Sequence, residues 1–573
     1  MATDMTVRPF LWRAANLFPE TEVVARTRDG VHRYTYADVE DRVRSLAAGL
    51  ADIGVGEGDR VGTFGWNHHR HFEAYYAAPL MGAQLHTINV QLSDDHVEFI
   101  VNDAGDDVLL VDPGDPFETV ERLWDRFDGV EAAVVMGDED AVPDDTDLPV
   151  HSFEALIEAG AADFEWPALS GDQPAGMCYT SGTTGKPKGV EYTHEMIYAH
   201  SLMVMTPAGL DIDEDDVVLP VVPMFHVNSW EFPYAATMAG ATQVYPGPSP
   251  DAADLVELIE AEGVTLTAGV PTVWIDVLDY LDDNEGDISS LERIVVGGSA
   301  APEGVMRRYE DEYGVTIDHA WGMTETMSIG SVSRPKAGMA DWDREARFAK
   351  RAKQGLLSPG LEMKIVDTEA QSASSNRTQS DDDDGEEQPW DGESVGELYV
   401  RGPTVVTEYY NRPEANEEEF EDVPASKASG ESEELRSSGR WLKTGDIASV
   451  DEDGYIEVVD RAKDVVKSGG EWISTIELEN ALMAHEDVVE AAVVAVPHER
   501  WRERPLACVV VRDGADLSAE ELLDFLDGEF PDWWLPDDVA FVDEVPRTAT
   551  GKFDKKVLRD RFDDPDLRFT PGE

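Results

Sequence analysis

One stretch of the chain reads Tyr179-Thr-Ser-Gly-Thr-Thr-Gly-Lys-Pro-Lys-Gly-Val190 and combines short hydroxyl side chains, sharply turning glycines and lysines. Hydroxyls and free backbone amides can surround phosphate oxygens while lysines neutralise their charge. The stretch is not a Walker A loop, because only two residues separate Gly182 from Gly185, and Pro187 follows Lys186. We therefore predict a phosphate-binding loop of another class. From composition alone, a solvated turn rich in Ser and Thr is the alternative.

Apolar runs with β-like composition recur on both sides of this loop. Helical patterns lie between several of them, over residues 38–50, 253–262 and 303–313. Strands that alternate with helices predict an α/β fold, with parallel or mixed sheets flanked by helices. Gly54 is expected to end the first helix, because the glycines at 54–58 precede a strand, the reverse of a dinucleotide-binding turn. The expected strands are 60–64, 108–111, 132–136, 217–222, 266–270 and 294–296.

A smaller version of this pattern begins near Asp464. It predicts a helix at 475–485, strands at 490–496 and 506–512, a helix at 518–529 and a strand at 539–542. We therefore predict a large N-terminal domain over residues 1–460 and a small α+β C-terminal domain over residues 464–573. Two acidic or Ser- and Glu-rich segments, 371–389 and 425–439, carry little apolar surface, so we expect solvated insertions there rather than sites.

Length and cysteine usage restrict the class of protein. The 573 residues allow two to four domains of ordinary size. Cys178 and Cys508 stand alone, which excludes a zinc ribbon or a disulfide-stapled secreted scaffold and favours a reducing cytoplasm. The first residues carry acid and base before any apolar run, and no run of about 18 apolar residues follows. We expect neither a signal peptide nor an integral membrane segment.

The charge of the chain is extreme. Its 45 basic and 119 acidic residues give a net charge of −74, and only 13 of the basic residues are lysines. Acid excess with few lysines is typical of adaptation to molar salt, where a Debye length of about 3 Å screens self-repulsion. Nucleic-acid binding is disfavoured, because no basic stripe is present. A disordered acidic chain is excluded by a hydrophobic content of 42% with 14 tryptophans.

Six segments, in order along residues 179–552, resemble those of the adenylate-forming superfamily, which includes acyl-CoA synthetases, luciferases and the adenylation domains of peptide synthetases. The first is the phosphate loop quoted above. The resemblance implies a large N-terminal domain and a mobile C-terminal lid. The other five segments are an adenine-pocket turn, Gly297-Gly-Ser-Ala-Ala-Pro302; a segment that usually begins with Tyr, Trp321-Gly-Met-Thr-Glu325; a ribose-binding turn, Lys443-Thr-Gly-Asp446; an interdomain hinge, Asp460-Arg-Ala-Lys-Asp-Val-Val-Lys-Ser-Gly-Gly-Glu471; and a lysine loop, Thr550-Gly-Lys552.

The resemblance implies a site for ATP and Mg²⁺. Glu325 and the Thr180 hydroxyl would hold Mg²⁺ across the phosphates, since hard oxygen ligands suit that ion. Asp446 can accept both ribose hydroxyls, and Arg461 can donate to them. Trp321 would stack on adenine, with a core tryptophan as the alternative. The other residues implied in this nucleotide site are Ser181, Gly182, Thr183, Thr184, Gly185, Lys186, Lys188, Gly298, Ser299, Ala300, Gly322 and Thr324.

The resemblance also implies roles for the lid. Lys552 would bring positive charge to the α-phosphate when the lid closes. Lys463 lies where the family pivots its lid, and rotation there would exchange the Lys552 loop for residues 467–470, whose glycines let backbone approach an incoming thiol. The residues of this second face are Lys467, Gly469, Gly470 and Trp472, of which Lys467 and Trp472 would contact the nucleotide in the first conformation. Candidates for the phosphates of coenzyme A are Arg500, Arg502 and Arg504, with a structural ion-pair role as the alternative.

A run of aromatic residues marks the acyl side. It reads Val222-Pro-Met-Phe-His-Val-Asn-Ser-Trp-Glu-Phe-Pro-Tyr234 and most resembles bacterial long- and medium-chain fatty acyl-CoA synthetases. In these, His226 would border the acyl carboxylate and Trp230 would gate an apolar tunnel; an aromatic core cluster is the alternative. The histidines at 65–69 and 85–89 lack metal-ligand spacing, so we expect no metal site there.

The resemblance implies an ATP-dependent fatty acid:CoA ligase with three small-molecule substrates, namely a fatty acid, ATP and coenzyme A. Adenylation of the carboxylate would be followed by transfer to the thiol. One alternative is an aryl-acid ligase or an enzyme that loads a carrier protein. Another is a nucleotide-binding protein without turnover, although such a protein needs neither Lys552 nor the glycines at 469–470. The resemblance allows a homodimer, because some long-chain relatives pair through their N-terminal domains.

Overall fold

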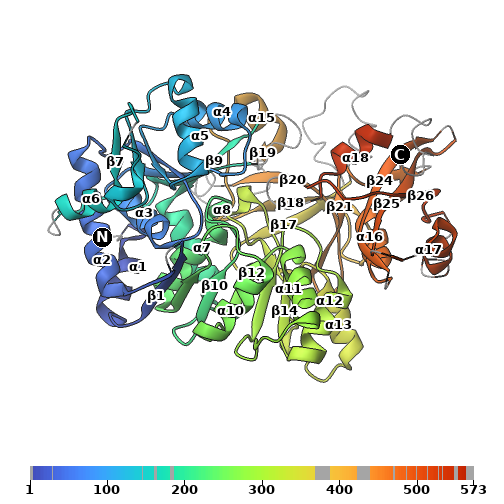
Figure 1. Ribbon diagram of the computed structural model, residues 1–573. Coiled ribbons are helices and arrows are strands. Elements are labelled where there is room, and N and C mark those ends of the chain that lie inside the picture. Colours follow the sequence, from blue (N-terminus) through green and yellow to red (C-terminus); the bar gives the residue numbers. More distant parts are fainter. Residues whose placement is uncertain are drawn as a thin grey trace, which may run out of the picture.

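The computed structural model describes residues 4–562 except for 29, 145, 161–163, 181–185, 368–386, 423–438, 469–470, 486, 499, 513, 516, 527, 529, 532 and 548–552. Within this part of the chain the strands form three sheets, with 14, seven and five strands (Figure 1). Helices cover the sheets, so the predicted α/β class is confirmed.

The largest sheet contains the middle of the chain and its first hairpin. Strands β1 and β10 to β14 pair in parallel, with β11 joining β10 to β1, whereas β2 and the strands from β15 onward pair antiparallel. The order is β17 (Glu362–Val366), β18 (Gly396–Arg401), β20 (Arg440–Val450), β21 (Tyr455–Arg461), β16 (Gly355–Leu357), β15 (Ser331–Val332), β14 (Thr316–Trp321), β13 (Arg293–Val296), β12 (Leu266–Gly269), β10 (Val217–Pro220), β11 (Thr242–Tyr245), β1 (Glu22–Thr27) and β2 (Gly30–Thr35), with β19 (Phe420–Asp422) paired to β20.

The predicted phosphate loop connects the last two strands of the second sheet. The parallel strands of this sheet are almost wholly buried, as in β5 and β6, which explains their continuous apolar composition. Its last strand, β9, is antiparallel to β8, and the phosphate loop joins these two. The order is β7 (Val150–Ser152), β6 (Ala132–Val135), β5 (Val108–Val111), β3 (Arg60–Phe64), β4 (Gln84–Thr87), β8 (Pro174–Tyr179) and β9 (Gly189–Thr193).

The third sheet lies at one end of the molecule, in the orange to red part of Figure 1. Strand β21 of the large sheet ends at Arg461, and β22 of the third sheet begins at Val466. The change of sheet therefore takes place over the few residues around Lys463. The order is β23 (Glu471–Ile473), β22 (Val466–Ser468), β25 (Arg502–Val511) and β24 (Val488–His498), with β26 (Asp538–Phe541) parallel to β25.

Local sequence explains where the helices begin and end. Thr35 caps the N-terminus of α2 and forms a capping box with Asp38, and Gly54 follows the helix with φ of +109°. The helices are α1 (Arg8–Leu17), α2 (Tyr36–Asp52), α3 (His69–Leu80), α4 (Asp94–Ala104), α5 (Asp115–Leu123), α6 (Phe153–Ala159), α7 (His194–Met205), α9 (Phe232–Ala239), α10 (Ala252–Glu262), α11 (Pro271–Asp283), α12 (Glu303–Arg308), α13 (Arg344–Ala352), α15 (Pro413–Glu419), α16 (Thr475–Met483), α17 (Ala519–Leu526) and α18 (Lys555–Phe562).

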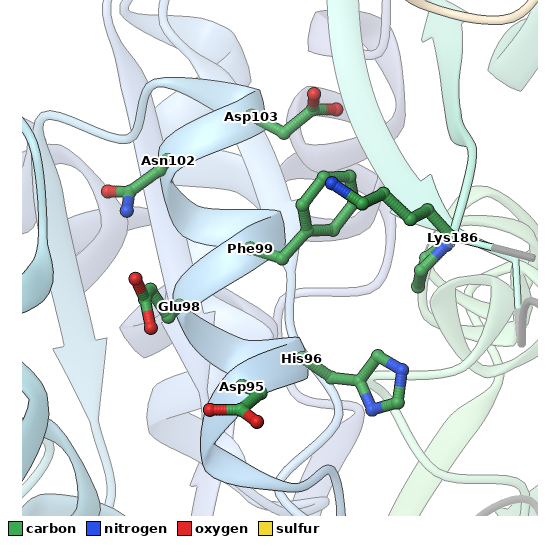
Figure 2. Close-up of a pocket in the computed structure, with 8 residues that line it drawn as sticks. Asp95, His96, Glu98, Phe99, Asn102, Asp103 and Lys186 are labelled. Atoms are coloured by element: carbon green, nitrogen blue, oxygen red, sulfur yellow. The ribbon is translucent and has the colours of Figure 1, made fainter.

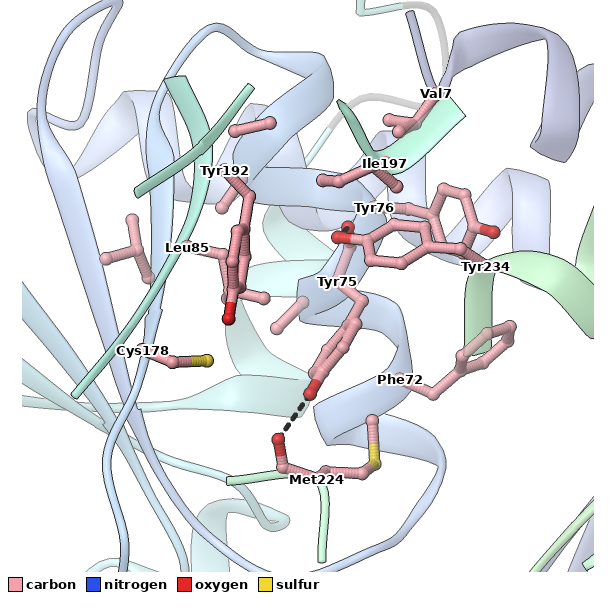
Figure 3. Packing of buried hydrophobic residues seen from close by; sticks show 14 of the residues in the cluster. Val7, Phe72, Tyr75, Tyr76, Leu85, Cys178, Tyr192, Ile197, Met224 and Tyr234 are labelled. Atoms are coloured by element: carbon pink, nitrogen blue, oxygen red, sulfur yellow. Dashed lines mark hydrogen bonds between the residues drawn. The ribbon is translucent and has the colours of Figure 1, made fainter. Parts of the chain in front are cut away.

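A buried cluster rich in tyrosine joins the segments that form the candidate functional site described below (Figure 3). The phenol of Tyr75, on α3, donates to the carbonyl of Met224, and that of Tyr234 donates to the carbonyl of Tyr75. Tyr192, on β9, donates to the carbonyl of Thr324 at 2.7 Å. These buried phenols satisfy their polar groups on backbone carbonyls, so the core joins segments distant in sequence without an unpaired hydroxyl at these positions.

Most predicted elements agree with the structure to within a few residues. One correction concerns 303–313, where α12 ends at Arg308 and a wider π-helical turn, Tyr309–Tyr313, follows. The hairpin of β22 and β23 and the helix α18 are not in the sequence prediction, because each is short and lacks a clear hydrophobic period. The predicted solvated insertions at 371–389 and 425–439 lie almost entirely outside the described residues.

Candidate functional site

The two flanks of the phosphate loop are paired. Tyr179 and Gly189 are partners in the β8–β9 ladder. Beyond them, the amide of Thr180 donates to the carbonyl of Lys188 at 3.0 Å, and the amide of Lys188 donates to the Thr180 hydroxyl at 3.2 Å. The loop therefore leaves and re-enters a fixed strand pair. The predicted loop residues Ser181, Gly182, Thr183, Thr184 and Gly185 lie outside the described residues.

Lys188 belongs to a cluster that also contains the predicted metal carboxylate. Its ammonium forms an ion pair with Glu419 and lies 4.3 Å from the centroid of the Tyr409 ring. The Tyr409 phenol lies 2.7 Å from Glu325 Oε1 and 2.7 Å from Glu419 Oε2. A phenol has one proton, so Tyr409 can donate to only one of these carboxylates at a time.

Burial dominates the electrostatics of Glu325. The residue lies in a short 3₁₀ turn, Thr324–Thr326, and is 6% exposed. Desolvation raises its pKa, and the hydrogen bond from Tyr409 and the charge of Lys188 act in the opposite direction. A carboxylate held in this way remains able to bind a cation that compensates its charge.

The oxygen donors of this cluster fit Mg²⁺. In the described chain, no three His, Cys, Asp or Glu side chains gather closely enough to hold a metal on their own. Protein sites for Mg²⁺ usually supply one or two carboxylates and leave the other positions to substrate phosphates and water. Glu325 and the Thr180 hydroxyl supply hard oxygens of that kind; the amide of Lys188 donates to Thr180, and the charge of Lys188 acts on Glu325.

Lys186 lies on the other side of the loop, against helix α4. Its ammonium is 4.7 Å from the centroid of the Phe99 ring, and Figure 2 shows the lysine reaching across to this helix. Arg412 lies 5.6 Å above the same ring and pairs with Asp103 at 2.8 Å. Asp103 also accepts a hydrogen bond from Tyr179 at 2.8 Å. Both flanks of the phosphate loop therefore contact residues one turn apart on α4. A cavity of about 580 Å³ lies here, lined by Asp95, His96, Glu98, Phe99, Asn102, Asp103, Lys186 and Pro187.

The predicted adenosine residues form a second cluster. Asp446, on β20, is 2% exposed and faces Arg461 of β21 in the strand register. Its Oδ1 accepts from Arg461 Nε at 2.7 Å, and its Oδ2 accepts from Trp321 Nε1 at 2.8 Å. The structure thus brings Trp321, Asp446 and Arg461 together, and the indole N–H supplies a polar contact to the carboxylate.

Glycines shape the turns beside this cluster. Gly322, the residue after β14, packs against the backbone of another loop. A Cβ there would lie 1.4 Å from the carbonyl oxygen of Ser328, so no side chain fits. Gly298 has φ of +84°, which favours glycine. The remaining predicted residues Ser299 and Ala300 lie in the same turn after β13, and Thr324 lies in the turn that carries Glu325.

The acyl segment adopts an unusual conformation. From Val227 to Glu231, five successive residues have φ between 43° and 62°, forming a left-handed turn labelled α8 (Val227–Trp230). Such backbone costs roughly 1–2 kcal/mol per residue, so its surroundings must hold it in place. His226 precedes the turn, and Trp230 lies buried against Gly297, where a Cβ would be 3.1 Å from the indole.

Polar contacts connect this turn to the strand that leads into the phosphate loop. Asn228 Nδ2 donates to Glu231 Oε1 at 3.0 Å, and Asn228 Oδ1 lies 3.1 Å from the thiol of Cys178 on β8. Burial raises the pKa of Glu231 to about 8, so the side chain is largely protonated at neutral pH. These contacts lie beside the residues predicted to border the acyl group, and no sequence motif identified them.

The lid residues are described in part. Lys463 is exposed, and desolvation by neighbouring groups lowers its pKa. Lys467 and Trp472 are partners in the β22–β23 hairpin, and the Lys467 amide donates to Glu503 at 2.9 Å. Gly469, Gly470, Lys552 and the side chain of Trp472 lie outside the described residues.

The three arginines considered for coenzyme A differ in their surroundings. Arg504 is 8% exposed, pairs with Asp537 at 2.8 Å and donates to the carbonyl of Leu535 at 2.8 Å. The structure therefore gives Arg504 the ion-pair role that the sequence left as an alternative. Arg500 lies 4.5 Å over the Trp501 ring, and Arg502 has φ of +73°.

The sequence did not identify three residues that the structure adds to the site. Tyr409 and Glu419 come from the segment around α15, and Phe99 comes from α4. No phosphate-binding or catalytic motif surrounds them in the sequence. Their lysine and carboxylate partners belong to motifs, but only the fold brings the two groups together.

Among the helices that the structure describes, none has the length and apolar character required to cross a membrane.

Comparison with known proteins agrees with this geometry. The sequence model of the AMP-binding enzyme family matches residues 11–410, and that of the AMP-binding enzyme C-terminal domain matches residues 477–552. A long-chain-fatty-acid–CoA ligase of Thermus thermophilus is 44% identical over 98% of this chain and 96% of its own length. A 3-methylmercaptopropionyl-CoA ligase of Ruegeria lacuscaerulensis is 40% identical over 98% of each chain.

A solved structure gives the same fold. The anthranilate CoA ligase AuaEII, in complex with anthranoyl-AMP, superposes with a TM-score of 0.82 over 98% of both chains, at 24% sequence identity. The family models together match most of the chain, and the relatives align over nearly its full length. This chain therefore belongs to the AMP-binding enzyme family.

Proposed function

We propose that this protein is an ATP-dependent fatty acid:CoA ligase, which first forms acyl-adenylate and pyrophosphate and then acyl-CoA and AMP. The observation that carries the proposal is the convergence of motifs from residues 180 to 461 on two clusters, one around Lys188 and Glu325 and one around Asp446, which are close enough that the charge of Arg461 acts on Glu325. The full-length similarity to a long-chain fatty acid–CoA ligase supports the same reaction. Splitting a difficult acyl transfer into two steps through a reactive intermediate is a general catalytic strategy.

In this proposal the nucleotide lies across the two clusters. Asp446 and Arg461 bind the ribose, Trp321 and the turn at 298–300 border the adenine, and residues 180–188 bind the phosphates. Glu325 and Thr180 would hold Mg²⁺, which supplies charge neutralisation to the phosphates when bound. The protein's own contribution is a set of donors oriented before the substrate arrives.

The lid forms the second part of the proposal. We place its boundary between residues 460 and 464, where the chain passes from the large sheet to the third sheet. Lys552 would face the α-phosphate in the adenylating conformation. Rotation about Lys463 would replace it with the hairpin that carries Lys467, Gly469, Gly470 and Trp472, which would border the coenzyme A thiol.

The acyl group would lie beside the left-handed turn. His226 would border the carboxylate, and Trp230 would control entry of the chain. The relatives include proteins named for a long-chain fatty acid and for 3-methylmercaptopropionate, so the test must cover short and long acids. We further propose that the protein works in a cytoplasm of molar salt, as its charge of −74 suggests. We also propose that the protein forms a homodimer.

Acid-dependent ATP–pyrophosphate exchange tests the adenylation step. We expect exchange that depends on a carboxylic acid in molar KCl, across a series of acids of increasing length. Product analysis with free coenzyme A tests the second step, because only a CoA ligase releases acyl-CoA. Exchange without acyl-CoA would favour loading of a carrier protein, and nucleotide binding without exchange would favour a protein without turnover.

Lys552→Ala separates the two half-reactions. We expect it to lower adenylate formation about 100-fold or more and to leave thioester formation from supplied acyl-adenylate nearly unchanged. Lys556→Ala is the matched control, because it removes the same charge from an exposed position four residues further on. Equal losses in the two assays for Lys552→Ala would contradict an alternating lid.

A further inference from the structure

Glu419 occupies both of its carboxylate oxygens within the nucleotide site. It is the last residue of α15, and its Oε1 pairs with the Lys188 ammonium while its Oε2 lies 2.7 Å from the Tyr409 phenol. Lys188 follows the phosphate loop, and its backbone pairs with Thr180. An acidic side chain therefore holds a cation that the proposed function assigns to a phosphate.

This arrangement imposes a competition. The Lys188 ammonium can neutralise an incoming phosphate only to the extent that it gives up the carboxylate of Glu419. The side chains of Lys188 and Glu419 are 19% and 33% exposed, so solvent screens their attraction without abolishing it. The same carboxylate also adds a negative charge close to where phosphates would bind.

We propose that the Glu419 carboxylate competes with phosphate for Lys188. In the nucleotide-free site it holds the Lys188 ammonium in place, and it releases this ammonium only to a ligand that makes several phosphate contacts. The proposal rests on the proposed function, because it assumes that Lys188 binds nucleotide phosphate. The competitor weakens every anion at Lys188 by a similar factor. A triphosphate nucleotide retains enough other contacts to bind well, whereas inorganic phosphate, with few contacts, binds only weakly.

The geometry also defines what happens to the displaced carboxylate. Tyr409 lies between Glu419 and Glu325 and can donate its single proton to either. When Lys188 moves to a phosphate, Glu419 loses its cation and becomes the better acceptor for that proton. Glu325 is then relieved of the phenol. Glu419 is thus a positioning residue that acts through Lys188 and Tyr409 rather than on the substrate.

Substitution Glu419→Gln tests the proposal, since it keeps the shape and an acceptor for Tyr409 and removes the charge. The matched control is Glu421→Gln, two residues further on, which removes the same charge from a pair with Lys364 at 2.7 Å. We would measure the Kd of a fluorescent ATP analogue with the full-length protein, with and without Mg²⁺, and the competition of inorganic phosphate against it. Thermal unfolding of each variant would confirm that it is folded.

We expect Glu419→Gln to lower the nucleotide Kd about two- to fivefold at low ionic strength and to lower the inhibition constant of inorganic phosphate by a similar factor. Both effects should shrink in 1 M KCl, because salt screens the pair. Glu421→Gln should change neither constant. Unchanged or weaker binding in Glu419→Gln, or equal effects in both variants, would overturn the proposal. Failure of the wild-type protein to bind the nucleotide at all would instead refute the proposed function.

Discussion

The ribose end and the phosphate end of the candidate site are built in different ways. At the ribose end, one buried carboxylate, Asp446, receives two donors, Trp321 and Arg461, all from the ends or interiors of strands in one sheet. At the phosphate end, Glu325 and Glu419 share one phenol, and the cation Lys188 follows a loop. The first cluster has donors matched to acceptors, and the second has more acceptors than its phenol can satisfy.

This difference indicates which end must rearrange when a nucleotide binds. Asp446 retains lone pairs for ribose hydroxyls while it keeps its two donors, since a carboxylate can accept about four hydrogen bonds. The phosphate end must exchange partners, because Lys188 cannot serve both Glu419 and a phosphate fully. We therefore expect contacts at the ribose end to contribute most of the affinity for the nucleotide. Binding at the phosphate end should depend more strongly on salt and pH.

Asp446→Asn should have the largest effect of the changes considered in the two clusters. The amide replaces one acceptor by a donor, which then faces Arg461 or Trp321 in a buried position. We expect kcat/KM for ATP to fall about 100-fold, measured by acid-dependent pyrophosphate exchange. Asp318→Asn is the control, because Asp318 is also buried, on the same strand as Trp321, but pairs with Arg334 at 2.8 Å rather than with the residues of this cluster. A similar loss in both variants would mean that the effect is one of stability.

Tyr409→Phe should have an intermediate effect that depends on pH. The phenol hydrogen bond opposes the burial that raises the pKa of Glu325, so its removal should raise that pKa further. A raised pKa favours the protonated acid, and metal-supported activity should be lost at a higher pH as the solution is acidified. We expect about a tenfold loss of kcat/KM at the acid limb, equivalent to a shift of one pKa unit, and recovery as the pH rises.

The neighbouring Tyr410→Phe provides the control for this variant. Tyr410 contacts Arg60, whose guanidinium lies 4.9 Å from its ring, and the substitution keeps that ring. Its pH profile should match the wild type. An unshifted profile in Tyr409→Phe would show that the phenol does not regulate Glu325, and the two ends of the site would then be more alike than their geometry suggests.

The sequence motifs name all three residues that meet at the proposed ribose end, but only some of those at the proposed phosphate end. Trp321, Asp446 and Arg461 each belong to a motif, and the strand register brings Asp446 opposite Arg461. Glu419 and Phe99 lie outside every motif, and their role depends on which helix packs beside the loop. The left-handed turn at 227–231 was also beyond prediction, because apart from Asn228 these residue types do not favour positive φ, and tertiary contacts must stabilise it.

Phe99→Leu should have the smallest effect and would sharpen the comparison. Leucine keeps an apolar side chain on α4 but removes the aromatic face under the Lys186 ammonium and Arg412. An exposed cation–π contact contributes about 0.5–1 kcal/mol, so we expect the KM for ATP to rise about two- to fivefold with little change in kcat. Phe99→Trp should restore the wild-type KM, because indole binds cations at least as well as a phenyl ring. If leucine and tryptophan behave alike, Lys186 gains nothing from the ring. The hydrogen bond from Tyr179 to Asp103 would then attach the loop flank to α4 without help from Lys186.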